Sequence, residues 1–235
     1  MSWKSFVARW RKPRAAAPAV PPPSIAHGPA GIRQVGHREY VGGKWDEIGQ
    51  LQFDFLVAQG LRPDHYLLDI ACGSLRGGVH FIPYLEPGHY LGIDKEPELI
   101  RAGRDEELSA TLRDEKRPVL LVDGHFAFDR FGVRPNYALA QSLFTHLPPE
   151  LIATCLRNLR DVIADDGVFY ATFFQSHADS HGNPDQAHDW GRFNYTRDQM
   201  ERLGRDAGWR MEYIGDWRHP RGQMMLRYFP VAPSS

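Results

Sequence analysis

The chain has 235 residues and a formal net charge of -1 at pH 7, and 42% of its residues are hydrophobic. This composition suits one folded core, and the near-zero charge argues against a nucleic-acid partner, which usually needs a basic surface. The only cysteines are Cys72 and Cys155, so we expect no disulfide framework and a cytoplasmic setting. We expect no membrane span and no secretory signal, because no apolar run is long enough.

Residues 1–30 are predicted to be a flexible segment ahead of a single folded domain over residues 31–235. The first 14 residues place tryptophan, phenylalanine and valine at helical spacing among basic side chains. Such a segment can contact an anionic membrane surface or a protein, and the alternative is a frayed tail, because so short a helix is marginal. Residues 15–30 are rich in alanine and proline, which predicts a semi-extended linker.

The folded domain is predicted to begin with a polar and aromatic stretch and a helix. The helix starts near Asp46, places Ile48, Phe55 and Leu56 on one face, and ends at Gly60. One apolar face of this kind indicates packing against a sheet.

The stretch from Tyr66 to Lys95 predicts a strand, a glycine-rich turn, a short helix and a second strand. The first strand, residues 66–70, is a continuous apolar run without alternation, as expected for a parallel strand buried on both faces. The turn after it is rich in glycine and lets a ligand approach the backbone. The second strand ends at Asp94, which lies at the usual spacing for an acid that accepts the hydroxyls of a ribose.

Five further apolar runs predict strands, and three stretches predict helices, the first of which covers residues 97–108 and has charged faces. A proline pair opens a helix that runs to about Ile163, and a capping box from Thr196 to Gln199 opens another, which ends at Gly208. The expected strands cover residues 119–122, 137–141, 168–174, 209–214 and 224–229.

The turn sequence from Asp69 to Gly78, DIACGSLRGG, resembles motif I of the class I S-adenosylmethionine-dependent methyltransferases. The resemblance covers roughly residues 60–229. It implies a doubly wound, Rossmann-like α/β fold with a seven-stranded sheet, mostly parallel with an antiparallel C-terminal strand. It also implies S-adenosyl-L-methionine as the cofactor. Ala71 and Leu75 stand where the family usually has glycine.

The resemblance also implies which residues bind the cofactor. Asp94 corresponds to the ribose acid, and Asp123 lies where the family holds the adenine ring, although an Asp-Gly pair at a strand end is also simply a good turn. The full set of expected cofactor-binding residues is Asp69, Ala71, Cys72, Gly73, Ser74, Asp94, Lys95, Asp123, Gly124, His125 and Gln141.

The residues after the fourth strand indicate the type of acceptor. Family members that methylate amino groups of bases often carry Asn-Pro-Pro-aromatic there, whereas this chain has Gln141-Ser142-Leu143-Phe144. This is more similar to the branch that acts on oxygen or small molecules. His146 is the expected general base, because an unperturbed imidazole has a pKa of about 6.5. The alternative for His146 is a histidine that fastens the turn.

Residues 175–195 are predicted to form the substrate loop, because an insertion at this place lies above the carboxyl ends of the strands. In the resembling family the segment before the first strand, here residues 31–60, often folds over the cofactor. The expected acceptor residues are Tyr40, Lys44, Trp45, His177, His181, His188 and Trp190. The loop's histidines and aspartates match no tight metal motif, so no metal is predicted.

The sequence thus predicts a methyltransferase that acts on a hydroxyl oxygen of a small molecule or glycan. One alternative is a nicotinamide-dependent oxidoreductase, which is less favoured because the Gly-x-Gly-x-x-Gly ladder and a Tyr-x-x-x-Lys pair are missing. The other is a module that binds S-adenosylmethionine without catalysis.

Overall fold

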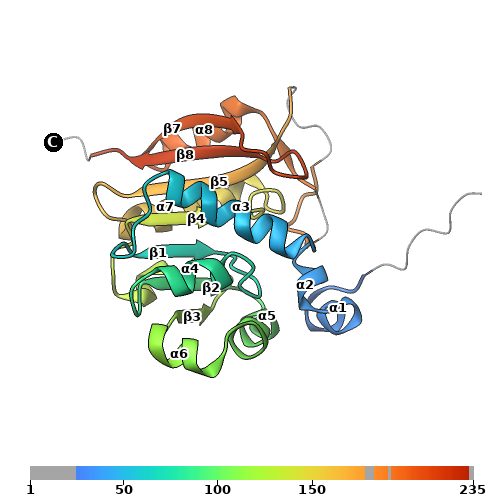
Figure 1. Cartoon of the computed structure of the whole chain (residues 1–235). Coiled ribbons are helices and arrows are strands. Elements are labelled where there is room, and N and C mark those ends of the chain that lie inside the picture. The colour runs from blue at the N-terminus through green and yellow to red at the C-terminus, as the bar shows by residue number, and fades with distance from the viewer. Residues whose placement is uncertain (1–24, 178–182, 190–191, 233–235) are drawn as a thin grey trace, which may run out of the picture.

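The computed structural model describes residues 25–177, 183–189 and 192–232. Its central sheet has the strand order β3-β2-β1-β4-β5-β8-β7, and β8 runs antiparallel to both of its neighbours (Figure 1). The remaining neighbours on this path are parallel. The predicted Rossmann-like sheet with an antiparallel C-terminal strand is confirmed. The strands are β1 (Leu67–Ile70), β2 (Tyr90–Asp94), β3 (Val119–Val122), β4 (Tyr137–Ala140), β5 (Val168–Gln175), β6 (Asn194–Tyr195), β7 (Trp209–Asp216) and β8 (Met224–Pro230).

The helices include several that the sequence did not predict. The α-helices are α1 (Gly28–Val35), α2 (His37–Tyr40), α3 (Trp45–Ala58), α4 (Gly78–Tyr84), α5 (Pro97–Ala102), α6 (Ala110–Lys116), α7 (Pro149–Val162) and α8 (Arg197–Asp206). The helix expected over residues 97–108 is α5 followed by a π-helical segment, Gly103–Glu107. Helix α1 begins inside the segment expected to be linker, and the amphipathic stretch 1–14 lies outside the described residues.

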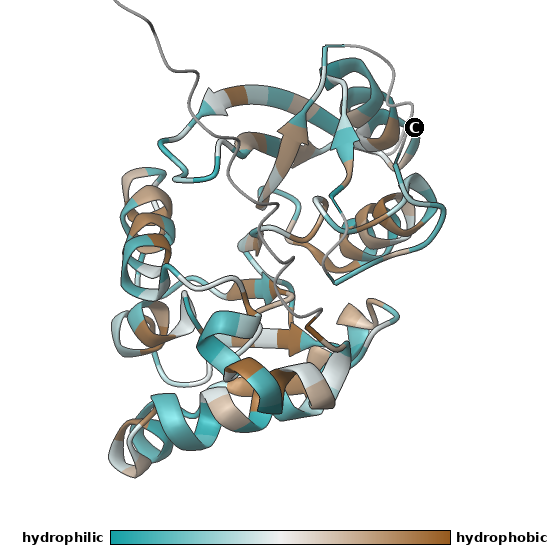
Figure 2. Cartoon of the chain, turned by 90° about the vertical axis from the view of Figure 1, so that its right-hand side faces the viewer, coloured by the Kyte–Doolittle hydropathy of each residue, from teal (hydrophilic) through white to brown (hydrophobic). Residues whose placement is uncertain are grey.

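Both faces of the sheet are covered, which explains the continuous apolar strands. On one face Leu68 and Ile70 of β1 join a core with α7 and α8. On the other face Leu67 packs with Leu56 of α3 and Phe81 of α4. Figure 2 shows the outer helices banded in brown and teal, as expected for helices with one buried side. None of the described helices is both long and apolar enough to cross a membrane.

The register brings the ends of the central strands together. Ile70 of β1 lies beside Ile93 of β2, and Asp69 lies beside Leu139 of β4. The turn that follows each of these strands therefore opens at the same edge of the sheet, next to α1 and α2 (Figure 1). In an open parallel sheet this edge is where ligands bind.

Candidate cofactor and acceptor site

A cavity of about 500 Å³ lies at the carboxyl ends of the parallel strands. Its wall combines the loop after β1, the residues that follow β2, β3 and β4, the end of β5, and the turn after α2. Residues 187–189 and the connection between β7 and β8 complete it. The volume is in the range of small-molecule and cofactor sites.

The glycine-rich loop after β1 holds an unusual backbone. Gly73 has a φ of 56°, and a Cβ there would lie 2.9 Å from a Val41 methyl group. Ala71 and Leu75 also have positive φ, 59° and 69°. Left-handed backbone favours glycine, which explains why glycine would suit both positions. Leu75 is nonetheless fully buried, so its side chain contributes to the core.

Asp94 presents its carboxylate next to this loop. The Gly73 N–H donates to Oδ2 and the Glu96 N–H donates to Oδ1, both at 2.9 Å. Burial raises the pKa of Asp94 to about 6, although these two backbone donors act in the opposite direction. A carboxylate has roughly four acceptor positions, so two bonds leave capacity for ligand hydroxyls.

Asp69 lies at the bottom of the cavity. The Tyr90 hydroxyl donates to its Oδ2 at 2.7 Å, and burial raises the pKa of Asp69 to about 7. The charge of Asp94 also raises this pKa. The two acids therefore disfavour each other's ionised form, and a bound cation or donor group would relieve that repulsion.

The residues after β3 form the outer end of the cavity. Asp123 accepts from the backbone N–H groups of His125 and Ala127, at 2.7 and 3.1 Å. These bonds lower the pKa of Asp123 in spite of its partial burial. Gly124 and Phe126 complete this end of the wall, where Phe126 offers an apolar ring.

Arg76 ties the N-terminal turn to the end of β4. It is buried, and its Nη1 donates to the carbonyls of Val41 and Gly43 at 3.0 and 3.1 Å. Its Nη2 donates to Gln141 Oε1 at 2.6 Å. Burial, followed by the repulsion of Arg221, lowers the pKa of Arg76 to about 10.

A buried network of amides and hydroxyls connects β4, β5 and the start of β8. Gln141 Nε2 donates to Ser142 Oγ at 2.7 Å and contacts His219 Nε2 at 3.0 Å. Thr172 donates to Gln223 Oε1 at 2.7 Å and accepts from the Ser142 N–H at the same distance. Burial lowers the pKa of His219 to about 4, so this histidine is neutral at physiological pH.

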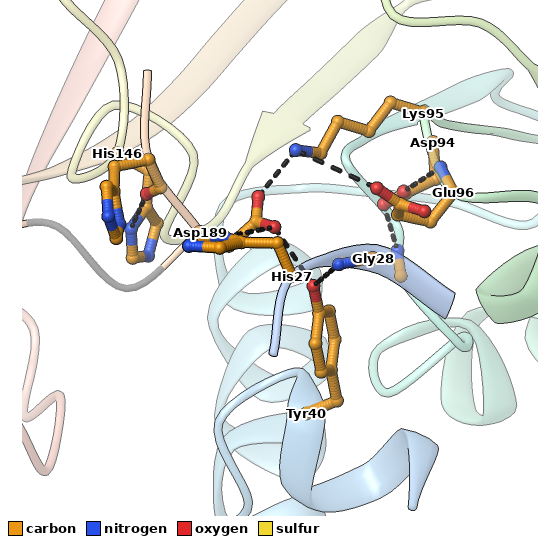
Figure 3. A network of polar contacts seen from close by, with 10 residues as sticks. His27, Gly28, Tyr40, Asp94, Lys95, Glu96, His146 and Asp189 are labelled. Atoms are coloured by element: carbon orange, nitrogen blue, oxygen red, sulfur yellow. Dashed lines mark hydrogen bonds and ion pairs between the residues drawn. The ribbon is translucent and has the colours of Figure 1, made fainter. Parts of the chain in front are cut away.

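Asp189 connects three parts of the chain that surround the cavity. Its Oδ1 accepts from Lys95 Nζ at 2.5 Å, and its Oδ2 accepts from the Tyr40 hydroxyl at 3.0 Å and contacts His27 Nδ1 at 3.3 Å. Figure 3 shows Asp189 between Lys95, at the end of β2, and Tyr40 of α2. Although burial acts against it, the hydrogen bond and charge of Lys95 hold the pKa of Asp189 down to about 2.

His146 lies in the turn after β4 and lines the same cavity. Its Nδ1 is 3.2 Å from the carbonyl oxygen of His188, and the His188 N–H donates to the His146 carbonyl at 3.1 Å (Figure 3). A carbonyl oxygen only accepts, so Nδ1 carries the proton in the neutral imidazole and the lone pair is on Nε2. This contact favours the neutral tautomer that carries its proton on Nδ1.

The cavity gathers most of the residues predicted from sequence. Ser74 is buried outside the cavity wall, His125 is exposed, and Lys44 pairs with Glu47 at 2.7 Å. Trp45 packs against His37 and Arg38. His177 lines a separate depression beside α8, and His181 and Trp190 lie outside the described residues. The predicted residues that line the main cavity are Asp69, Ala71, Cys72, Gly73, Asp94, Lys95, Asp123, Gly124, Gln141, Tyr40, His146 and His188.

Sequence reasoning missed several residues of this wall: Arg76, Asp189, Arg192, Arg221 and Gln223. Arg76 belongs to the turn sequence from Asp69 to Gly78, so its position in the sequence could have indicated that it lines the cavity. Asp189 and Arg192 lie in the predicted substrate loop, residues 175–195, although neither was singled out. Arg221 and Gln223 come from the connection between β7 and β8, whose approach to the cavity depends on tertiary packing. No group of three or more described histidines, cysteines and acids is placed to hold a metal ion.

Solved methyltransferases share this fold. The chain is similar to a magnesium protoporphyrin IX methyltransferase from Synechocystis PCC 6803 with bound S-adenosylmethionine (TM-score 0.58, 14% identity, 83% of this chain and 89% of that chain). It is also similar to the CcbJ methyltransferase from Streptomyces caelestis (0.62, 14%, 82% and 92%) and to the glycopeptide N-methyltransferase MtfA complexed with S-adenosylmethionine (0.59, 14%, 77% and 94%). No family model matches the sequence. At these identities the comparison establishes the class I methyltransferase fold.

Proposed function

We propose that this protein is an S-adenosylmethionine-dependent methyltransferase acting on a hydroxyl oxygen of a small molecule or glycan. The observation that carries the proposal is the position of Asp94: its carboxylate lines the cavity directly beside the glycine-rich turn, with acceptor capacity left over. This is the arrangement that a ribose with two free hydroxyls requires. The same fold in methyltransferases that hold S-adenosylmethionine supports it.

The wall of the cavity fits this cofactor. Asp94 would hold the ribose hydroxyls, and the Asp123 to Phe126 turn would lie against the adenine ring. Gly73 lines the cavity and has no side chain, so the loop leaves its backbone open to a ligand there. Asp69 and Gln141 line the part of the wall next to this loop, where they would contact the amino-acid end of the cofactor.

The bound cofactor supplies an electrophilic methyl group on a sulfonium. The protein must therefore hold the acceptor oxygen in line and remove its proton. His146 suits proton removal, because its Nδ1–H is directed at the His188 carbonyl and its lone pair is on Nε2. His188 lies in the loop expected to contact the acceptor, so acceptor binding and orientation of the base are linked.

The choice of oxygen rests on the residues after β4. Gln141 is held by Arg76, Ser142 and His219, which occupies its amide in the network of the wall. An amide so engaged is poorly placed to receive an amine in the way that the Asn-Pro-Pro-aromatic motif does. The competing outcome is nitrogen as acceptor atom, because the similar structures include a glycopeptide N-methyltransferase.

Calorimetry with S-adenosylhomocysteine and with NADH tests the cofactor class. We expect the thioether nucleoside to bind and NADH not to bind. Binding of NADH alone would contradict the proposal. A screen of alcohols and amines with methyl-labelled cofactor then tests the acceptor atom, and label on amines alone would replace oxygen by nitrogen.

A further inference from the structure

The two ends of the cavity differ in charge. Carboxylates line the wall near β1, β2 and β3, at Asp69, Asp94 and Asp123. The wall near β4, β5 and β8 carries guanidinium groups from Arg221 and Arg192, and Arg76 of the loop after β1 reaches this part of the wall through Gln141. Lys95 and Asp189, which also line the cavity, pair with each other. Within the described ranges, none of these three arginines has a carboxylate oxygen within the 4.0 Å of an ion pair.

Arg221 and Arg76 converge on one turn. Both donate to carbonyl oxygens of residues 41–43, Arg76 to Val41 and Gly43 and Arg221 to Gly42. Arg76 Nε is buried and has no hydrogen-bond partner among the described residues. The two cations repel each other, and this repulsion adds to burial, the larger cause, in lowering the pKa of Arg76. An anion at this end would relieve the repulsion and satisfy donors that carbonyls leave unused.

Arg192 lines the same cavity and lies beside the end of β5. Its guanidinium lies over the Phe174 ring at 3.8 Å, and its Nε donates to Asn194 at 3.1 Å. Phe173 pairs with Met224, so Phe174 at the end of β5 lies beside Gln223 at the start of β8. Arg221 precedes Gln223 by two residues in the connection between β7 and β8. Arg192 and Arg221 therefore both border the acceptor end, and both are exposed enough to meet a ligand.

We propose that the methyl acceptor carries a carboxylate or phosphate group, bound by Arg221 and Arg192 at the end of the cavity where β5 and β8 meet. Two planar guanidinium groups suit such oxygens because each can donate two parallel hydrogen bonds. The acceptor hydroxyl would then lie toward His146, with the anion anchored away from the acids of the cofactor end. This inference rests on the proposed methyltransferase function, because that function divides the cavity into cofactor and acceptor ends.

Inorganic phosphate is the first probe. The thermal unfolding midpoint is measured as the phosphate concentration rises at constant ionic strength, with and without S-adenosylhomocysteine. Four proteins are compared: the unmodified chain, Arg221→Gln, Arg192→Gln and the matched control Arg218→Gln. Arg218 is exposed in the same connection as Arg221 and does not line the cavity. We expect phosphate to bind the unmodified chain and the control alike and about tenfold more weakly to each of the other variants. Equal responses in all four proteins, or no response in the unmodified chain, overturn the proposal.

The cofactor has a carboxylate of its own. A second experiment therefore tests whether the arginines bind this carboxylate or the anionic group of the acceptor. Calorimetry compares S-adenosylhomocysteine with 5′-methylthioadenosine, which lacks the amino-acid end. We expect Arg221→Gln to bind both within about twofold of the unmodified chain. A loss confined to S-adenosylhomocysteine assigns Arg221 to the cofactor and overturns the proposal.

Labelled methyl transfer to matched acceptors completes the test. Hydroxy acids are compared with their amides, and sugar phosphates with the free sugars; we expect label only on the charged member of a pair. Equal transfer of the labelled methyl group to the neutral members would overturn the proposal that the acceptor is anionic. If the unmodified chain binds no S-adenosylhomocysteine, the methyltransferase proposal fails separately, while an arginine-dependent phosphate response in the ligand-free protein still shows the anion site.

Discussion

The end of the cavity that we propose for the cofactor and the end that we propose for the acceptor are built in different ways. The cofactor end uses single residues at the ends of adjacent strands, such as Asp94, the last residue of β2, and Asp123, directly after β3. The acceptor end joins residues distant in sequence, among them His146 in the turn after β4, Arg192 and Arg221. The first arrangement is fixed by the sheet, and the second depends on how loops pack on it. The predictions below test this difference.

Replacing His146 at the acceptor end is expected to have the largest effect. If its Nε2 removes the acceptor proton, His146→Ala lowers the turnover rate by about 10²- to 10⁴-fold, the usual contribution of a general base. The affinity for S-adenosylhomocysteine should stay nearly unchanged, because the cofactor end does not depend on the imidazole. Turnover is measured with the acceptor found by labelled transfer, and affinity by calorimetry.

Two other histidines serve as comparisons for His146. His177→Ala is the matched control, because His177 is exposed outside the main cavity. His188 lines the cavity, so His188→Ala should chiefly raise the KM for the acceptor. A rate that survives in His146→Ala and is lost in His188→Ala would move the chemistry into the substrate loop.

Asp94 tests the cofactor end. Asp94→Ala should weaken binding of S-adenosylhomocysteine by about 1.5 to 3 kcal/mol, the range for hydrogen bonds to a charged group, or roughly tenfold to 150-fold. Asp114→Ala, at an exposed position of α6, is the control and should bind normally. Unchanged affinity in a folded Asp94→Ala protein would remove Asp94 from the site.

The raised pKa of Asp94 gives this prediction a pH dependence. Below about pH 6 the carboxyl is protonated and accepts fewer hydrogen bonds, so affinity should fall by up to about tenfold per pH unit. Stability of the ligand-free protein should change in the opposite direction. The folded state keeps this proton longer than the unfolded chain, so unfolding free energy decreases as pH rises from about 4 to about 6. Asp94→Ala should lack this part of the slope in urea titrations.

The sequence was sufficient for the arrangement of the sheet and for most of the residues that line the cavity at the ends of β1, β2 and β3. Strand β2 was predicted to within one residue, because a parallel strand buried on both faces leaves a continuous apolar run. Helices α1 and α2 were missed, since segments of eight and four residues have too few turns to show a period. Asp189 lies in the stretch 175–195 that was predicted as the substrate loop, but its contacts with Lys95 and Tyr40 could not be predicted. Arg221 could not be placed, because an arginine in a loop usually faces solvent and only tertiary packing brings it to the cavity.

Asp189 links the two ends, and its removal should have a moderate effect. Asp189→Asn loses the charge that pairs with Lys95 while it keeps the size of the side chain. A partly buried ion pair of this kind contributes about 1 kcal/mol, so the rate of S-adenosylhomocysteine dissociation should rise roughly fivefold. Stopped-flow displacement measures this rate, with Asp185→Asn in the same loop as the control. Identical dissociation rates would show that the contact does not retain the cofactor.

The smallest expected effect comes from Ala71, where the backbone rather than a side chain is tested. Ala71→Gly removes a left-handed penalty of about 1 to 2 kcal/mol and adds about 0.4 to 1 kcal/mol of unfolded-state entropy. The unfolding free energy in urea should therefore rise by about 1 kcal/mol or less. Ala127→Gly is the control, because Ala127 has a φ of -77° and gains no relief, so it should be destabilised. Leu75 cannot serve, since its buried side chain would be lost with the strain. Equal destabilisation at Ala71 and Ala127 would mean that the loop after β1 relaxes around alanine without cost.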